Sequence, residues 1–305
     1  MTSTIAPEDH SPEEAPAVAH EGLEARAAVA ERRRGFLLGL PAMVYLTLLF
    51  VLPFFIVGVY SFATRSATGS TRLSDWNIDS YVKLFDPLVV GIVWRSFWIA
   101  SLTTVICLVV AYPFAYYIAT RSRAARNVLL VFVMIPFWSN FLIRTYAWRF
   151  LLGSDGPIAQ ASEALGLGTI RVLFTPVAVA IGLIYGFLPF MILPLYAAIE
   201  RMDWRLVEAA RDLYADGWTA FRKVTLPLTK SGILAGSLLV FVPSFGAYVT
   251  PEILGGAKTV MLGSYVVRQF QQARNWPFGS ALSIVIMIIM LVALIARQRS
   301  GAREL

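Results

Sequence analysis

Long apolar segments alternate with short polar segments along this chain. Six of them have the roughly 20 mostly apolar residues that a helix needs to cross the hydrocarbon core of a bilayer. They are residues 36–62, 92–120, 127–150, 173–199, 229–250 and 278–297. These runs are long and lack the two-residue period of barrel strands. The pattern therefore predicts an all-α polytopic membrane protein with six transmembrane helices.

The third and fifth segments are the least uniform. The third carries Asn140 and Arg144, and Pro243 and Gly246 should bend the fifth. Glycines four residues apart also fall in or beside the segments, where they let helix backbones approach closely in lipid. We expect them to pack within this chain rather than against a partner subunit. The pairs are Gly35/Gly39, Gly182/Gly186 and Gly232/Gly236.

Composition supports the membrane class. Hydrophobic residues make up 57% of the 305 residues, charged residues only 15%, and the mean hydropathy is +0.66. Soluble domains carry more charge. The net charge of +7 comes from basic residues beside the apolar segments, where they set topology, so nucleic-acid binding is not expected. The first segment is too long for the apolar region of a signal peptide and should be an uncleaved helix.

The positions of the basic residues predict the topology. With the N-terminus in the cytoplasm, 16 of the 26 basic residues fall on the inner side, as basic residues in short cytoplasmic loops do. Both termini are then cytoplasmic. Residues 1–34 are expected to form a disordered tail, residues 35–299 the membrane domain, and residues 300–305 a second tail. The inner basic residues are Arg26, Arg32, Arg33, Arg34, Arg121, Arg123, Arg126, Arg201, Arg205, Arg211, Arg222, Lys223, Lys230, Arg297, Arg299 and Arg303.

The sequence offers little that could support catalysis. Cys107 is the one cysteine and lies in an apolar segment, and the two histidines, His10 and His20, lie in the tail. No HExxH or CxxC motif occurs. The run Gly255–Thr259 resembles a phosphate-binding loop only loosely, because it lacks the glycine spacing that wraps phosphates. We therefore expect no catalytic residue, no metal and no other cofactor, and an energy source outside this chain.

A polar, helix-prone loop over residues 203–228 separates the fourth and fifth segments. Four of its residues should share one face of a helix over 204–214, because they follow one another at steps of three or four: Trp204, Val207, Ala210 and Tyr214. Asp203 is a candidate N-cap, and Glu208 can pair with Arg211. Gly217 should allow a turn before a second helix over 218–224. Two such helices would form a rigid projection.

The loop resembles the EAA loop of ABC importer permeases. The pattern is Glu208-Ala209-Ala210, a later glycine, and Leu226-Pro227 at the expected spacing. An amphipathic helix that only lies on lipid headgroups would explain the charges but not the paired alanines. One departure is Tyr214, which stands where the family usually has glycine. Gly217 comes three residues later, so we expect the turn to be displaced by about one helical turn.

The resemblance extends over roughly residues 36–297 and is closest to spermidine/putrescine permeases of the PotB type. It rests on residues 136–148, 175–196, 255–258 and 275–279. It implies the type I, MetI-like permease fold of an ABC importer. Two permease subunits, expected to be a heterodimer, would form the path, two cytoplasmic ATPases would bind the EAA loops, and an extracellular binding protein would deliver a small cation. Residues implied in ATPase coupling are Glu208, Ala209, Ala210, Asp212, Gly217, Leu226 and Pro227.

A path for a polyamine needs carboxylates for the ammonium groups and aromatic faces for the methylenes. The candidates are Trp138, Asn140, Tyr146 and Glu252. Interfacial roles would also explain Tyr146 and Glu252. Arg144 is unexpected in a path for cations. It could pair with an acid of a partner subunit or extend toward the interface.

Other functions fit the same pattern less well. The permease could carry another amine, an opine or an amino-acid derivative. An ion-coupled secondary transporter would need inverted repeats and ionisable residues inside the membrane, and few are present. A membrane-embedded enzyme would need His, Cys or acidic clusters, which the sequence lacks.

Deletion of residues 1–30 should leave transport largely intact, because the tail lacks the apolar content to fold. Uptake by cells that carry the truncated chain in place of the full one measures this. Complete loss of uptake would contradict the prediction.

Overall fold

The computed structural model describes residues 39–66, 69–166, 168 and 171–301. The tail predicted over residues 1–34 lies outside the described residues, as does most of the tail predicted over 300–305. The chain divides into two compact units, residues 1–59 and 60–305. Helix Gly39–Ser61 accounts for the described part of the first unit. It has 23 apolar-rich residues, which is long enough to cross a bilayer.

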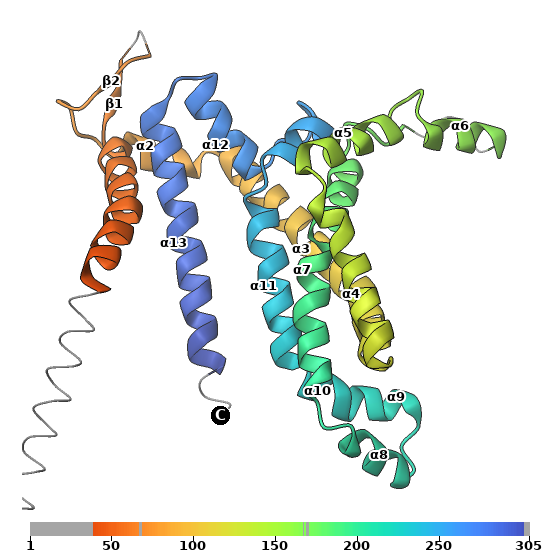
Figure 1. Ribbon diagram of the computed structural model, residues 1–305. Helices are drawn as coiled ribbons and strands as arrows, with labels where there is room; N and C mark the ends of the chain where they lie inside the picture. The colour runs from red at the N-terminus through yellow and green to blue at the C-terminus, as the bar shows by residue number, and fades with distance from the viewer. Residues whose placement is uncertain (1–38, 67–68, 167, 169–170, 302–305) are drawn as a thin grey trace, which may run out of the picture. The chain divides into compact units, whose positions relative to one another are not determined.

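The second unit is almost entirely helical (Figure 1). A small antiparallel hairpin pairs Thr64 with Arg72 and Arg65 with Thr71. In chain order the elements are β1 (Thr64–Arg65), β2 (Thr71–Arg72), α2 (Asp79–Val82), the 3₁₀ turn η1 (Lys83–Phe85), α3 (Pro87–Ala119), α4 (Arg123–Trp138), α5 (Phe141–Leu151), α6 (Pro157–Ala164), α7 (Pro176–Glu200), α8 (Arg205–Asp212), α9 (Gly217–Ala220), the π-helical turn η2 (Phe221–Thr225), α10 (Leu226–Leu228), α11 (Lys230–Phe245), the π-helical turn η3 (Pro251–Gly255), α12 (Leu262–Gln271) and α13 (Trp276–Gly301).

Each of the six predicted apolar segments overlaps a helix in the described part of the chain. By length and composition, three described helices can cross a membrane: Gly39–Ser61, α3 and α7. The number rises to five if each of two bent helix pairs counts as one span. The apolar part of α13, Trp276–Val292, is shorter. The all-α membrane fold is therefore confirmed, and the count of six spans is consistent with it but stays a prediction.

The third segment is broken rather than continuous. Helices α4 and α5 meet at an angle of 84° across Ser139 and Asn140. Asn140 is the N-cap of α5. Its side-chain Oδ1 accepts hydrogen bonds from the backbone nitrogens of Leu142 (2.8 Å) and Ile143 (3.4 Å). These bonds satisfy donors that a helix N-terminus leaves free.

The large bend of the fifth segment lies elsewhere than predicted. Helices Gly217–Leu228 and Lys230–Phe245 meet at 67° around Thr229. Pro243 lies within α11, and Gly246 is the residue at which that helix ends. The bend thus separates the polar loop from the apolar helix and does not divide the apolar helix itself.

The core of the second unit lies where α3, α7 and α11 pack together (Figure 1). Small side chains on α3, including Ala111 and Ala115, are fully buried there against Met191 and Leu195 of α7. At one end, Arg126 at the start of α4 forms an ion pair with Glu200 at the end of α7. Small residues allow the close approach that holds helices together where the surrounding lipid is as apolar as the side chains.

Glycines set the spacing between α7 and α11. A Cβ at Gly232 would lie 2.5 Å from the Cβ of Ala198, and one at Gly236 would lie 2.7 Å from the Sδ of Met191. Gly182 is equally crowded by Leu254 and Thr250. The expected packing within this chain is confirmed for these three glycines. Gly186 and Gly39 have open space, and Gly35 lies outside the described residues.

The turn after α8 is formed by Tyr214, which has a φ of 62°. The Ala215 nitrogen donates to the Ala210 oxygen and the Tyr214 nitrogen to the Arg211 oxygen, both at 3.0 Å. These two bonds form a Schellman motif, in which the residue after the C-cap is left-handed and usually glycine. Tyr214 therefore occupies the glycine position itself. The displaced turn predicted at Gly217 is wrong: Gly217 is the first residue of α9 and has no positive φ.

Replacing Tyr214 by glycine should stabilise this turn, because a side chain in the left-handed region costs about 1 kcal/mol or more. We expect about fivefold slower amide hydrogen exchange at Ala215 in Tyr214→Gly than in Tyr214→Ala, after correction for intrinsic rates. Tyr214→Ala is the matched control, since it removes the ring but keeps the strained backbone. Equal exchange in the two variants would contradict the assignment.

Candidate functional site

The loop between α7 and α11 folds as a compact projection at one end of the helices (Figure 1). One face of α8 is buried: Val207 is 5% exposed and packs with Met202 and Ala220. The opposite face is polar and open. One side of α8 packs against other residues of the loop. The projection therefore has a small hydrophobic core of its own.

Aromatic side chains fix this projection to α3. The ring of Phe221 meets that of Tyr112 edge to face at 5.3 Å, and Trp204 meets Tyr116 in the same way at 5.6 Å. Both loop rings also pack against the core of α3, α7 and α11. Such pairs add to the stabilisation from burial, so the loop and the helices should move together.

A buried hydrogen bond joins the loop to α3 at the bend before α11. Thr229 is fully buried, and its hydroxyl lies 2.7 Å from the hydroxyl of Tyr112. The same Thr229 hydroxyl donates to the backbone oxygen of Thr225 at 2.8 Å. A buried hydroxyl that loses its partner costs free energy, so this bond holds the bend to the C-terminal part of α3.

The residues predicted to couple to an ATPase lie along the open side of the projection. Glu208, Ala209, Asp212 and Gly217 are exposed, as is Pro227, while Leu226 is 37% exposed. Ala210 is half-buried and packs on the Val207 cluster. The structure thus brings most of these side chains to an accessible surface on a folded support. It does not test their role, which stays a prediction.

Charges on the loop are largely free for an external partner. Glu208 and Arg211 form no ion pair among the described residues, in contrast to our expectation. Trp204, and not Asp203 as predicted, is the N-cap residue of α8, although the Asp203 side chain accepts from the Arg205 nitrogen at 3.0 Å. A hydrogen bond from the Thr219 side chain lowers the pKa of the Asp216 carboxyl.

Exposed apolar residues on the projection were missed by the sequence analysis. Tyr214 is 99% exposed, Leu213 81% and Trp218 66%. We predicted that Tyr214 shares a helix face with Val207, and that prediction is wrong because α8 ends at Asp212 and the left-handed backbone of Tyr214 turns the chain away from the helix. The sequence did indicate this exposure, because Tyr214 stands where the family usually has a glycine, and a glycine there marks the end of the helix.

The predicted path residues of the third segment lie around the α4–α5 break. Trp138 is 76% exposed and Tyr146 54% exposed. The side-chain oxygen of Asn140 is used to cap α5. The cap gives the Asn140 amide oxygen its hydrogen-bond partners. A role in binding substrate remains a prediction for all three residues.

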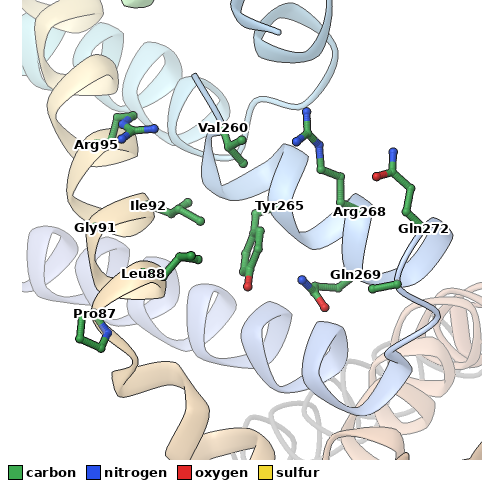
Figure 2. Close-up of a pocket in the computed structure, with 11 residues that line it drawn as sticks. Pro87, Leu88, Gly91, Ile92, Arg95, Val260, Tyr265, Arg268, Gln269 and Gln272 are labelled. Carbon is green, nitrogen blue, oxygen red and sulfur yellow. The ribbon is translucent and has the colours of Figure 1, made fainter. Parts of the chain in front are cut away.

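Glu252 lies in η3 and is paired. Both its carboxylate oxygens lie within 3.3 Å of the Arg268 guanidinium on α12, the shortest contact being 3.0 Å. Arg268 also lines a cleft of about 620 Å³ between the start of α3 and α12. Figure 2 shows Leu88 and Ile92 of α3 on one side and Tyr265 and Arg268 of α12 on the other. In this structure the Arg268 guanidinium therefore neutralises the negative charge of the Glu252 carboxylate.

Comparison with known proteins identifies the family. Residues 111–300 match the model of the family described as binding-protein-dependent transport system inner membrane component. The chain is 41% identical over 264 residues to the spermidine/putrescine transport system permease protein PotB of Haemophilus influenzae, covering 85% of this chain and 92% of that protein. It is 39% identical to PotB of Escherichia coli strain K12, covering 84% of this chain and 94% of that one.

Solved structures agree on the fold. A chain of a bacterial ABC transporter that imports the acidic polysaccharide alginate superposes with a TM-score of 0.69 at 16% identity, covering 92% of this chain and 99% of that one. A chain of a bacterial alginate ABC transporter in complex with an alginate pentasaccharide-bound periplasmic protein gives a TM-score of 0.69 at 17% identity, covering 91% of this chain and 96% of that one. The family match, the relatives and the shared fold together show that this chain belongs to the binding-protein-dependent transport system inner membrane component family, the membrane-spanning permease subunits of ABC importers.

Proposed function

We propose that this permease subunit imports polyamines, spermidine or putrescine. The observation that supports this substrate class is the identity of about 40% to permeases that are named for it, over most of both chains. The import mechanism is alternating access, in which closure of partner ATPases moves the EAA loop and the loop moves the helices.

The physical basis for coupling is the rigid connection between loop and bundle. Glu208 and Asp212 present carboxylates on the open side of α8, and Ala209 permits close approach of a partner. Val207 holds the opposite side of the same helix. A force on α8 therefore reaches α3 through the Phe221 and Thr229 contacts, since neither contact can relax without exposing a ring or an unpaired hydroxyl.

The proposed assembly contains more than this chain. Two cytoplasmic ATPases bind the EAA loops, here Glu208 to Pro227, a second permease completes the path, and an extracellular binding protein delivers the cation. The chain itself is a multi-pass inner-membrane protein. Both termini are proposed to be cytoplasmic, with residues 35–299 forming a six-helix domain between the two tails, because that topology places the basic EAA loop inside.

We place the substrate path beside the α4–α5 break. The exposed faces of Trp138 and Tyr146 can contact the methylenes and ammonium groups of a polyamine. Asn140 contributes its amide group at the same break. Glu252 can attract the cation only if its pairing with Arg268 is exchanged, so it would act at a conformational step and not as a free site.

Uptake of labelled spermidine by proteoliposomes that contain the complete transporter tests the proposal. We expect uptake to require the binding protein, hydrolysable ATP and an active ATPase, and unlabelled putrescine to compete. Uptake that persists with an inactive ATPase would favour an ion-coupled transporter, and failure of polyamines to compete would contradict the substrate class.

Glu208→Ala tests the coupling role. We expect at least about fivefold less uptake per assembled transporter, because the contact that transmits the ATPase movement weakens by about 1 kcal/mol or more. Glu163→Gln is the control, an exposed acid on α6 outside the loop. Normal uptake and normal ATPase binding in Glu208→Ala would contradict the role of this residue.

The bond between Tyr112 and Thr229 should affect coupling rather than assembly. Tyr112→Phe and Thr229→Val each should lower uptake per ATP hydrolysed by about two- to fivefold, the effect expected from about 0.5–1 kcal/mol. The double variant should be no worse than the more affected single variant, because both remove one interaction. Additive losses would show that the two side chains act separately.

A further inference from the structure

Arg144 carries a charge that the described part of the chain does not neutralise. It lies in the first turn of α5 and is half-buried as a residue. Its Nε and Nη1 atoms are fully buried and have no hydrogen-bond partner among the described residues. Both atoms are donors that a guanidinium normally places against a carboxylate or carbonyl oxygen.

Aromatic rings surround this guanidinium without replacing those bonds. The Arg144 Cζ lies 5.9 Å from the centre of the Phe137 ring and 6.0 Å from those of Phe141 and Tyr185. These distances are at the outer limit of cation–π attraction. The rings do not supply the oxygen acceptors that the two buried N–H groups lack, and an unpaired buried donor is costly.

The depth of the site argues against a lipid headgroup as partner. Tyr185, which faces Arg144, lies nine residues from one end of α7 and 15 from the other. At 1.5 Å per residue these separations are about 14 Å and 22 Å. The guanidinium therefore lies beside the hydrocarbon part of the helix, where an uncompensated charge is costly.

Two acids at the ends of membrane helices are already paired among the described residues. Glu200 pairs with Arg126, and Glu252 pairs with Arg268. Close to Arg144, the surface of the α4–α5 break is open, with Ile143 68% and Trp138 76% exposed. A cationic substrate is repelled by a guanidinium, so charge complementarity points to an acidic side chain from another membrane subunit.

We propose that a carboxylate of the second permease subunit binds Arg144 at the α4–α5 break. The inference rests on the proposed function, since it requires a two-permease assembly. Such an ion pair neutralises the guanidinium charge and gives its buried N–H groups an acceptor. It also removes a positive charge from the region where Trp138 and Tyr146 are proposed to meet the cation.

Charge removal tests the pair in the complete transporter. We expect Arg144→Met to weaken the association between the two permeases at least about thirtyfold, because it leaves a buried carboxylate unpaired. The measurement is the fraction of the second permease that co-purifies with this chain through a detergent dilution series. Arg149→Met is the matched control, an exposed arginine on the same helix. Unchanged or tighter association in Arg144→Met would overturn the proposal.

Charge reversal identifies the partner. We expect Arg144→Glu to abolish assembly and one Asp→Arg or Glu→Arg change in the membrane helices of the second permease to restore it. Restoration by none of these changes would overturn the proposal. So would an Arg144→Met transporter that assembles normally but has a raised KM for uptake, since Arg144 would then bind substrate.

A crosslink that keeps Arg144 intact covers the case in which these variants fail to fold. A photoreactive residue at Ile143 should form an adduct with the second permease. An adduct with lipid alone would overturn the inference. These measurements report assembly, so they remain valid if the wild-type transporter fails to import polyamine, a result that would contradict the proposed function alone.

Discussion

The structure depends on the attachment of a polar loop to three apolar helices. Thr229 marks the place where the chain turns by 67° from the loop into α11, and its hydroxyl meets that of Tyr112 near the C-terminal end of α3. Phe221 and Trp204 pack on the same stretch of α3. These contacts make a peripheral segment part of the core. Without them, the loop would be tethered only by its two ends and could move without moving the helices.

Polar groups within the apolar region follow a second constraint, since no water is available to satisfy them. Several hydroxyls on the helices donate to their own backbone, as Thr104 does to Ala100 and Thr145 does to Phe141. Asn140 begins a new helix, and Ser96 accepts from the Leu262 nitrogen at 2.7 Å, which ties α12 to α3. Arg144 departs from this pattern among the described residues of the third segment, because two of its buried donor atoms have no partner. This supports its assignment as a contact to another subunit.

The Tyr214 turn illustrates how a fold keeps its geometry when its usual residue is absent. The Schellman bonds to Ala210 and Arg211 fix a left-handed residue after α8 whatever its side chain. Tyrosine accepts this conformation at an energetic cost and places its ring entirely in solvent. The backbone bonds, not the side chain, therefore define the end of the helix, and this is why the glycine spacing in the sequence misplaced the turn.

The sequence by itself determined the membrane class, the helical segments and the presence of the loop, because apolar runs of about 20 residues and a charged interval between them leave few alternatives. It also located the glycines that bring α7 against α11. Only the tertiary structure decided the break at Asn140, the bend at Thr229 and the left-handed Tyr214, since each depends on which hydrogen bonds compete locally. It alone paired Glu252 with Arg268 and left Arg144 without a carboxylate, because ion pairs form between residues that are distant in sequence and brought together only by packing.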